Sequence, residues 1–162
     1  MFDAPQTLLP NPSATDDLGL YGGTFGTDSP TIQTFDLKAA GPSTLRARIQ
    51  LALPPEYEAG ETVTLRISAG MLTTVADVSA TIDVEAHEID RIGAVGSDLV
   101  TTSALDINNL ALADKDFTIT PTGLAAGDML DIRITLAIND AATGTAVIGL
   151  IGAVELLCDI RG

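Results

Sequence analysis

The sequence predicts an all-β protein built as an antiparallel sandwich or barrel. Three observations lead to this class. Apolar residues recur at every second position, turn residues (Gly, Pro, Asn and Asp) separate the alternating segments, and no segment carries a convincing helical stripe. Short alternating strands joined by such turns are typical of antiparallel sheets packed around one core. The chain has 162 residues, which fits one domain with a substantial core.

The predicted strands are the segments in which the alternation is cleanest. In the first of them, Leu45, Ala47 and Ile49 take one face while Arg46 and Arg48 take the other. A shift of one residue in the strand pairing would move all the apolar side chains to the solvent-exposed face, so the register of each strand is well specified. The segments are 45–53, 63–69, 78–86, 117–120 and 130–138. A short turn of helix fits only 70–76 and 103–112.

Two stretches of the chain resemble each other, at 59–67 and 126–134. Each has a glycine turn, an acidic residue and then an alternating strand with an arginine on its polar side, Arg66 in one and Arg133 in the other. Glycine supplies the permissive turn conformation. Two explanations remain open: a duplicated unit, one per sheet or per Greek key, and convergence on a common pattern of turn and strand.

The N-terminal part differs from the rest, so we divide the chain into an extended arm at 1–30 and a sandwich domain at 31–162. Prolines and glycines interrupt the arm, and it still carries Leu18, Leu20, Tyr21 and Phe25. A purely solvated tail would not need this apolar surface. We therefore expect the arm to pack on its own domain or on a neighbour, with a disordered leader over 1–13 as the alternative.

The last predicted strand is apolar or small on both faces over 145–154. A strand of a monomeric sandwich should keep one face in contact with solvent, so we expect residues 147–153 to contact another subunit or the arm. A loop of the same chain over that face is the alternative. Glycines in the stretch would permit close backbone approach or a bulge. The predicted interface consists of Leu18, Leu20, Tyr21, Phe25, Val147, Gly149, Ile151 and Ala153.

Composition excludes several partners. The formal net charge is -14, which repels phosphate backbones and anionic lipid, so we expect neither nucleic acid nor membrane as a partner. No apolar stretch approaches the roughly 20 residues of a membrane helix, and the start lacks a signal peptide. Cys158 is the only cysteine, on the apolar side of its strand. A buried structural thiol in a protein made in a reducing cytoplasm is the prediction.

The residues needed for catalysis are missing, so we predict no enzyme, no catalytic residue, no cofactor and no metal site. His87 is the only histidine and lies on a polar strand face, which favours a surface residue over a catalytic base. One His and one Cys do not make a zinc site. Aromatic platforms for sugars are scarce too: only Tyr21, Phe25 and Tyr57 are candidates.

Calcium is the one ion that loop residues could hold. Asp106, Asn108 and Asn109 form one oxygen-rich group, and Asp114 and Asp116 form another. Neither fits the EF-hand pattern. Turn-forming Asp and Asn residues are the simpler explanation.

The C-terminal half resembles a known class of proteins. The run FTITPTGLAAGD at 117–128, the segment LDIR at 130–133 and the ending VELLCDIRG at 154–162 resemble small capsid-associated proteins of tailed bacteriophages, which include head decoration, or cement, proteins. The resemblance covers about 60–162 and carries no active-site signature.

The resemblance implies a jelly-roll-like two-sheet sandwich with an N-terminal arm. It also implies a homotrimer that binds the major capsid protein, stabilises the outer surface of a phage head and is located in the virion after synthesis in the host cytoplasm. Multivalent contact would make weak individual interfaces effective. The alternatives are a non-catalytic binding module for carbohydrate or a cell surface, and a phage tail or spike component.

Overall fold

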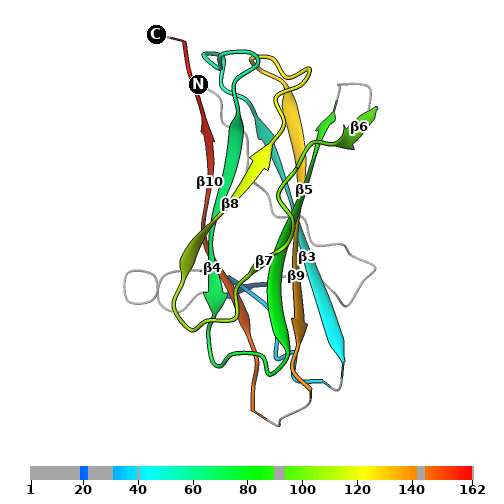
Figure 1. Ribbon diagram of the computed structural model, residues 1–162, viewed down its shortest axis with the longest axis vertical. Coiled ribbons are helices and arrows are strands. Elements are labelled where there is room, and N and C mark those ends of the chain that lie inside the picture. The colour runs from blue at the N-terminus through cyan, green and yellow to red at the C-terminus, as the bar shows by residue number, and fades with distance from the viewer. Residues whose placement is uncertain (1–18, 22–30, 40, 90–93, 142–144, 162) are drawn as a thin grey trace.

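The computed structural model describes residues 19–21, 31–39, 41–89, 94–141 and 145–161. They form two antiparallel sheets that pack face to face (Figure 1), which confirms the predicted all-β sandwich. Sheet A has the order β3 (Pro42–Ala52), β9 (Met129–Asn139), β5 (Ser79–Ile89) and β6 (Val95–Asp98), and β7 (Leu105–Asp106) also pairs with β5. Sheet B has the order β1 (Gly19–Tyr21), β2 (Thr31–Gln33), β10 (Gly149–Cys158), β4 (Val63–Met71) and β8 (Ala113–Ile119).

The core lies between the two sheets and is built from the apolar side of each alternating strand. In β9, every second residue from Leu130 to Ile138 has a relative exposure of 0%, and in β4 the same holds for Leu65 and Ile67. Each such side chain contributes about 1.5–3 kcal/mol on leaving water. The alternation of apolar and polar residues therefore determines which segments form strands, and burial of the apolar side chains holds the two sheets together.

All five predicted strands correspond to observed ones, with at least one end of each within one residue, whereas the predicted helical turns are wrong. The described part of the chain contains no helix: Met71 continues β4, and 105–106 form β7. Hydrogen bonds link the two segments. The Asn108 side chain accepts one from the Ala76 backbone N–H (2.7 Å) and donates one to the Ala76 carbonyl (2.9 Å). Side-chain bonds of this kind compete with helical backbone bonds.

The two similar stretches occupy equivalent places, one in each sheet. They lead into β4 of sheet B and β9 of sheet A. Gly60 and Gly127 open them with positive φ values of 93° and 84°, a conformation that favours glycine. In both, the arginine pairs with an acid on the neighbouring strand: Arg66 with Asp116 (2.7 Å) and Arg133 with Glu85. This placement is the one that a repeat per sheet predicts.

Strand β10 lies between β2 and β4 and contains a bulge. Ile151 is opposite Ala69, but Val154 is opposite Ile67, so one extra residue is inserted into β10. The bulge changes which positions face the core. Before it, Val147 and Ile151 point inward and are fully buried, and after it the inward positions are Val154, Leu156 and Cys158.

This burial corrects the expected placement of two interface residues. The side chains of Val147 and Ile151 belong to the core of their own chain, so they are not available to a second subunit. Gly149 also faces inward: a Cβ built there would lie 3.0 Å from Ile138 Cδ1. Among the predicted residues of this strand, Ala153 is exposed.

Segments of the same chain cover much of β10, which was the alternative to subunit contact. Ile32 and Gln33 of β2 pair with Ile151 and Leu150. On the outer side, a Cβ built at Gly152 would lie 3.4 Å from Leu112 Cδ1. Part of the predicted arm, Gly19–Tyr21 with Leu20, joins sheet B as β1. Leu18 and Phe25 lie outside the described residues.

Candidate functional site

The outer face of sheet A presents an ordered array of polar side chains. Antiparallel register aligns them in rows across β3, β9 and β5. One row is Arg48, Arg133 and Glu85, and the next is Gln50, Asp131 and His87. A third row is Arg46, Thr135 and Asp83. We call these nine residues the polar array. It holds three of the eight basic residues of the chain.

Ion pairs between strands fix the centre of the polar array. Arg48 Nε donates to Asp131 Oδ1 at 2.6 Å, and Arg48 Nη2 donates to Asp131 Oδ2. This bidentate contact raises the pKa of the Arg48 guanidinium. Arg133 pairs with Glu85 on the other neighbouring strand. Such pairs hold long side chains in one geometry, which prepares them for contact with a ligand.

The polar array is open to solvent and nearly balanced in charge. The side chains of Arg48 and Arg133 are 51% and 50% exposed. Its three arginines face three carboxylates, those of Asp83, Glu85 and Asp131. Within a chain of formal charge -14, this face therefore offers both hydrogen-bond donors and acceptors without a strong field of either sign.

The predicted surface position of His87 is confirmed. It lies on the outer side of β5, where its Nδ1 is 3.1 Å from the Gly96 carbonyl oxygen. Cys158 points inward from β10 in the other sheet. The fold does not bring these two residues together, so they cannot act as a Cys-His pair.

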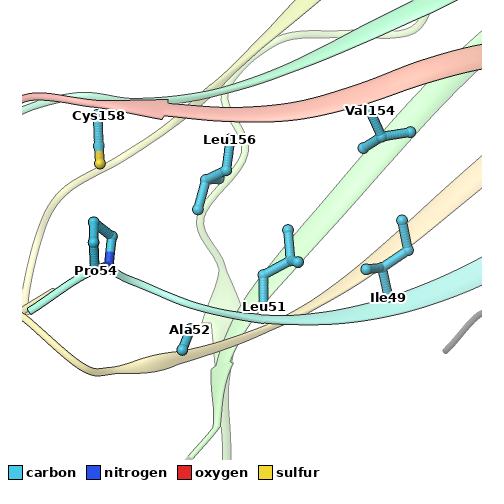
Figure 2. Close-up of a pocket in the computed structure, with 7 residues that line it drawn as sticks. All are labelled: Ile49, Leu51, Ala52, Pro54, Val154, Leu156 and Cys158. Atoms are coloured by element: carbon cyan, nitrogen blue, oxygen red, sulfur yellow. The ribbon is translucent and has the colours of Figure 1, made fainter. Parts of the chain in front are cut away.

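A small apolar groove opens between the sheets beside Cys158. Its volume is about 280 Å³. Figure 2 shows Val154, Leu156 and Cys158 of β10 facing Leu51 and its neighbours of β3. After the bulge, the edge of β10 that faces away from β4 has no partner strand within the described sheet. β3 is likewise the edge strand of sheet A. The groove therefore stays open between these two strand edges.

The chemistry of this groove is limited. Its lining consists of Ile49, Leu51, Ala52, Pro54, Val154, Leu156 and Cys158. Desolvation raises the pKa of the Cys158 thiol, which keeps it protonated and a poor nucleophile. The predicted buried thiol is therefore half-buried at the rim of the core, and the groove offers no polar group to orient a substrate.

The residues considered for calcium have other partners. Asp106 Oδ1 accepts the Asn108 backbone N–H (3.2 Å), and Asn109 Oδ1 accepts that of Ala111 (2.8 Å). These bonds stabilise turns. Arg66 lowers the pKa of Asp116 through a side-chain hydrogen bond. No group of three potential metal ligands occurs in the part of the chain that the structure describes.

Aromatic residues were partly misjudged from the sequence. Tyr57, a candidate sugar platform, is fully buried, and its hydroxyl donates to the Glu61 carbonyl at 2.5 Å. Phe35, which the sequence pattern does not single out, is 50% exposed beside β10. Tyr21 lies in β1, and Phe25 lies outside the described residues. The pattern around a lone aromatic does not reveal its burial.

Among the residues that the structure describes, no helix has the length and apolarity needed to cross a membrane.

Comparison with known proteins shows a shared fold. No family model matches the sequence, and no curated protein matches it. An arabinose-bound α-L-arabinofuranosidase matches with TM-score 0.51 and 12% identity over 94% of this chain and 25% of that chain. A candidate sugar-binding protein from Bacteroides thetaiotaomicron matches with TM-score 0.50 and 9% identity over 93% and 86%. TmCBM61 with β-1,4-galactotriose gives TM-score 0.49 and 11% identity over 96% and 90%. Identities this low establish the sandwich fold alone.

Proposed function

We propose that this chain is a non-catalytic binding module that binds a neutral carbohydrate on the polar array of sheet A. The observation that carries the proposal is the exposed, charge-balanced grid of arginines and carboxylates on adjacent strands. A sugar hydroxyl is both donor and acceptor, and a neighbouring donor and acceptor can engage adjacent hydroxyls together. The ion pairs already fix these groups, so little side-chain entropy is lost on binding.

The charge distribution favours a neutral ligand over an anionic one. The arginines of the array are matched by carboxylates, and the whole chain repels anions. The sandwich shared with the candidate sugar-binding protein supplies the ligand class to be tested. Because the nine array residues include no Phe, Tyr or Trp, affinity rests on hydrogen bonds, and we expect a Kd of about 1 mM.

The test compares two equivalent arginines. Arg133→Ala removes a central donor of the array, and we expect it to weaken binding by roughly tenfold or more, since a hydrogen bond to a charged group contributes about 1.5–3 kcal/mol. Arg66→Ala removes the matching ion-paired arginine on the outer face of sheet B and should leave binding unchanged. NMR titration with neutral galacto- and xylo-oligosaccharides, and with a uronate oligosaccharide, gives the Kd values.

Two results would overturn the carbohydrate proposal. One is that none of the sugars binds at millimolar concentration to the folded wild-type chain. The other is that Arg66→Ala weakens binding as much as Arg133→Ala does. Preferred binding of the uronate would reject a neutral ligand.

A second candidate is the virion role that the resemblance implies, namely a trimeric decoration protein on the major capsid protein. The observation that favours an assembly role is the group of apolar side chains exposed on the sheet B side, among them Phe35, Leu72 and Leu110, because exposed apolar patches mark protein contacts. We expect the chain to sediment with capsid shells when it is co-expressed with the capsid gene of the same genome. Recovery only in the soluble fraction would reject this role, and association with tails instead would favour a tail or spike component.

A further inference from the structure

The outer surface of sheet B carries an apolar patch at the end where β10 begins. Four large side chains form it, with exposures of 50% for Phe35, 47% for Leu72, 59% for Leu110 and 44% for Leu112. Ile148, which is half-buried, lies among them. We call these five residues the apolar patch. None of them belongs to the polar array, which lies on the other sheet.

Backbone contacts bring the members of the patch together from four distant segments. The Leu72 N–H donates to the Ile148 carbonyl (2.8 Å) on one side of the strand entering β10. On the other side, the N–H of Thr34 donates to the carbonyl of Gly149 (3.0 Å). Thr34 is only 2% exposed and faces inward, so its neighbour Phe35 faces out.

Leu110 and Leu112 lie over the same surface. The Met71 N–H donates to the Asn109 carbonyl (2.8 Å), and a Cβ at Gly70 would lie 2.9 Å from the Ala111 carbonyl oxygen. Leu112 reaches Gly152, as described above. Leu72, which follows Met71, is therefore adjacent to both Ile148 and the segment 109–112 at this end of sheet B.

The charges next to the patch are paired. Asp36 follows Phe35, and its carboxylate lies 3.0 Å from Lys38 Nζ and accepts the Val147 N–H at 3.0 Å. These contacts, the Val147 hydrogen bond first, lower the pKa of Asp36. Farther along the sheet, Arg66 pairs with Asp116. In a chain with 22 acidic residues, pairing of this kind lowers the like-charge repulsion that a second copy meets at the patch.

We propose that the apolar patch is the contact between copies of this chain in a homo-oligomer. The exposures given above amount to roughly 400 Å² of surface, within the 300–600 Å² that the largest patch on a monomer shows. A stable interface buries about 800 Å² per partner, of which about 65% is apolar in homodimers. One patch therefore supplies the apolar centre that such an interface needs. This proposal does not depend on carbohydrate binding.

The test is the molar mass of the full chain by light scattering coupled to size exclusion. A mass of two or three times 16.7 kDa supports the proposal, and a monomer at all concentrations overturns it. Leu110→Asp should weaken association by at least about tenfold, because it buries an unpaired charge in the contact. Higher salt should strengthen association by screening the acidic chains from each other.

A matched control separates the patch from a general charge effect. Val95→Asp adds the same charge at a side chain that is 62% exposed on β6 of sheet A. It should leave the oligomer intact, and equal dissociation by both variants would overturn the proposal. Circular dichroism should show the wild-type β spectrum for both, since both sites are exposed. Sugar titration of Leu110→Asp reads the polar array separately, so failure of either proposal can be recognised without the other.

Discussion

Deletion of Gly152 together with Ala153 is expected to unfold the sandwich, whereas deletion of Gly152 alone should leave it folded. The reason is the bulge in β10, where three steps along the chain from Ile151 to Val154 match two steps from Ala69 to Ile67. The extra residue sets which side chains after the bulge face the core. Removing one residue restores a regular ladder with Val154, Leu156 and Cys158 still inward.

Removing two residues inverts this half of the strand. Glu155 and Leu157, now on the outer side, would turn inward, while Val154 and Leu156 would turn to solvent. Burying an unpaired carboxylate costs several kcal/mol, and the apolar side chains lose about 1.5–3 kcal/mol each. Together these losses match the whole stability of a typical domain, about 5–15 kcal/mol.

Urea unfolding followed by circular dichroism measures both deletions. We expect a cooperative transition for the single deletion, with a loss of no more than about 3 kcal/mol, and no cooperative transition for the double deletion. Equal stability of the two variants would show that β10 does not fix its register at Ile151 and Val154.

Phe117→Ala is expected to lower the free energy of unfolding by about 3–5 kcal/mol. Phe117 is the largest side chain that β8 places in the core, and its exposure is 0%. Tyr57 is the only other ring in the described core, and its hydroxyl is bonded to the Glu61 carbonyl. We therefore expect no ring to move into the space. The cavity that remains adds its own cost to the lost burial.

Thermal and urea unfolding of Phe117→Ala and Phe117→Leu test this expectation. The leucine variant fills most of the space and should lose less than half as much stability as the alanine variant. If alanine costs no more than about 1 kcal/mol, a typical value for any substitution, then Phe117 is not a central element of the core.

The strands could be predicted because their side chains alternate without interruption. The series from Leu130 to Ile138 defines β9 from sequence alone, and each inward residue is buried as expected. The glycines of β10 indicated a possible bulge. The sequence could not show why the run over 145–154 is apolar on both faces. The bulge and the neighbouring loop over it account for this run, and the bulge exists only through pairing with β4.

The polar array could not be predicted because its members come from strands far apart in the chain. Arg48 and Asp131 are 83 positions apart, and only the order of strands in sheet A makes them neighbours. The apolar patch is hidden for a second reason. Phe35 and Leu110 lie outside the regular strands, where alternation gives no information about which side chains are exposed.

The order of strands in the two sheets determines when this protein can fold during synthesis. The central strand of each sheet is among the last to be made: β9 separates β3 from β5, and β10 separates β2 from β4. Until β9 leaves the ribosome, β3 has no partner strand within the described sheets. The β1–β2 pair likewise cannot join the rest of sheet B until β10 has been made. The pairs that need neither β9 nor β10 can form earlier, namely β1 with β2, β5 with β6 and β7, and β4 with β8. The chain must therefore keep β3 and one edge each of β4 and β5 unpaired until β9 and β10 are made, and in that period chaperones and aggregation compete for them.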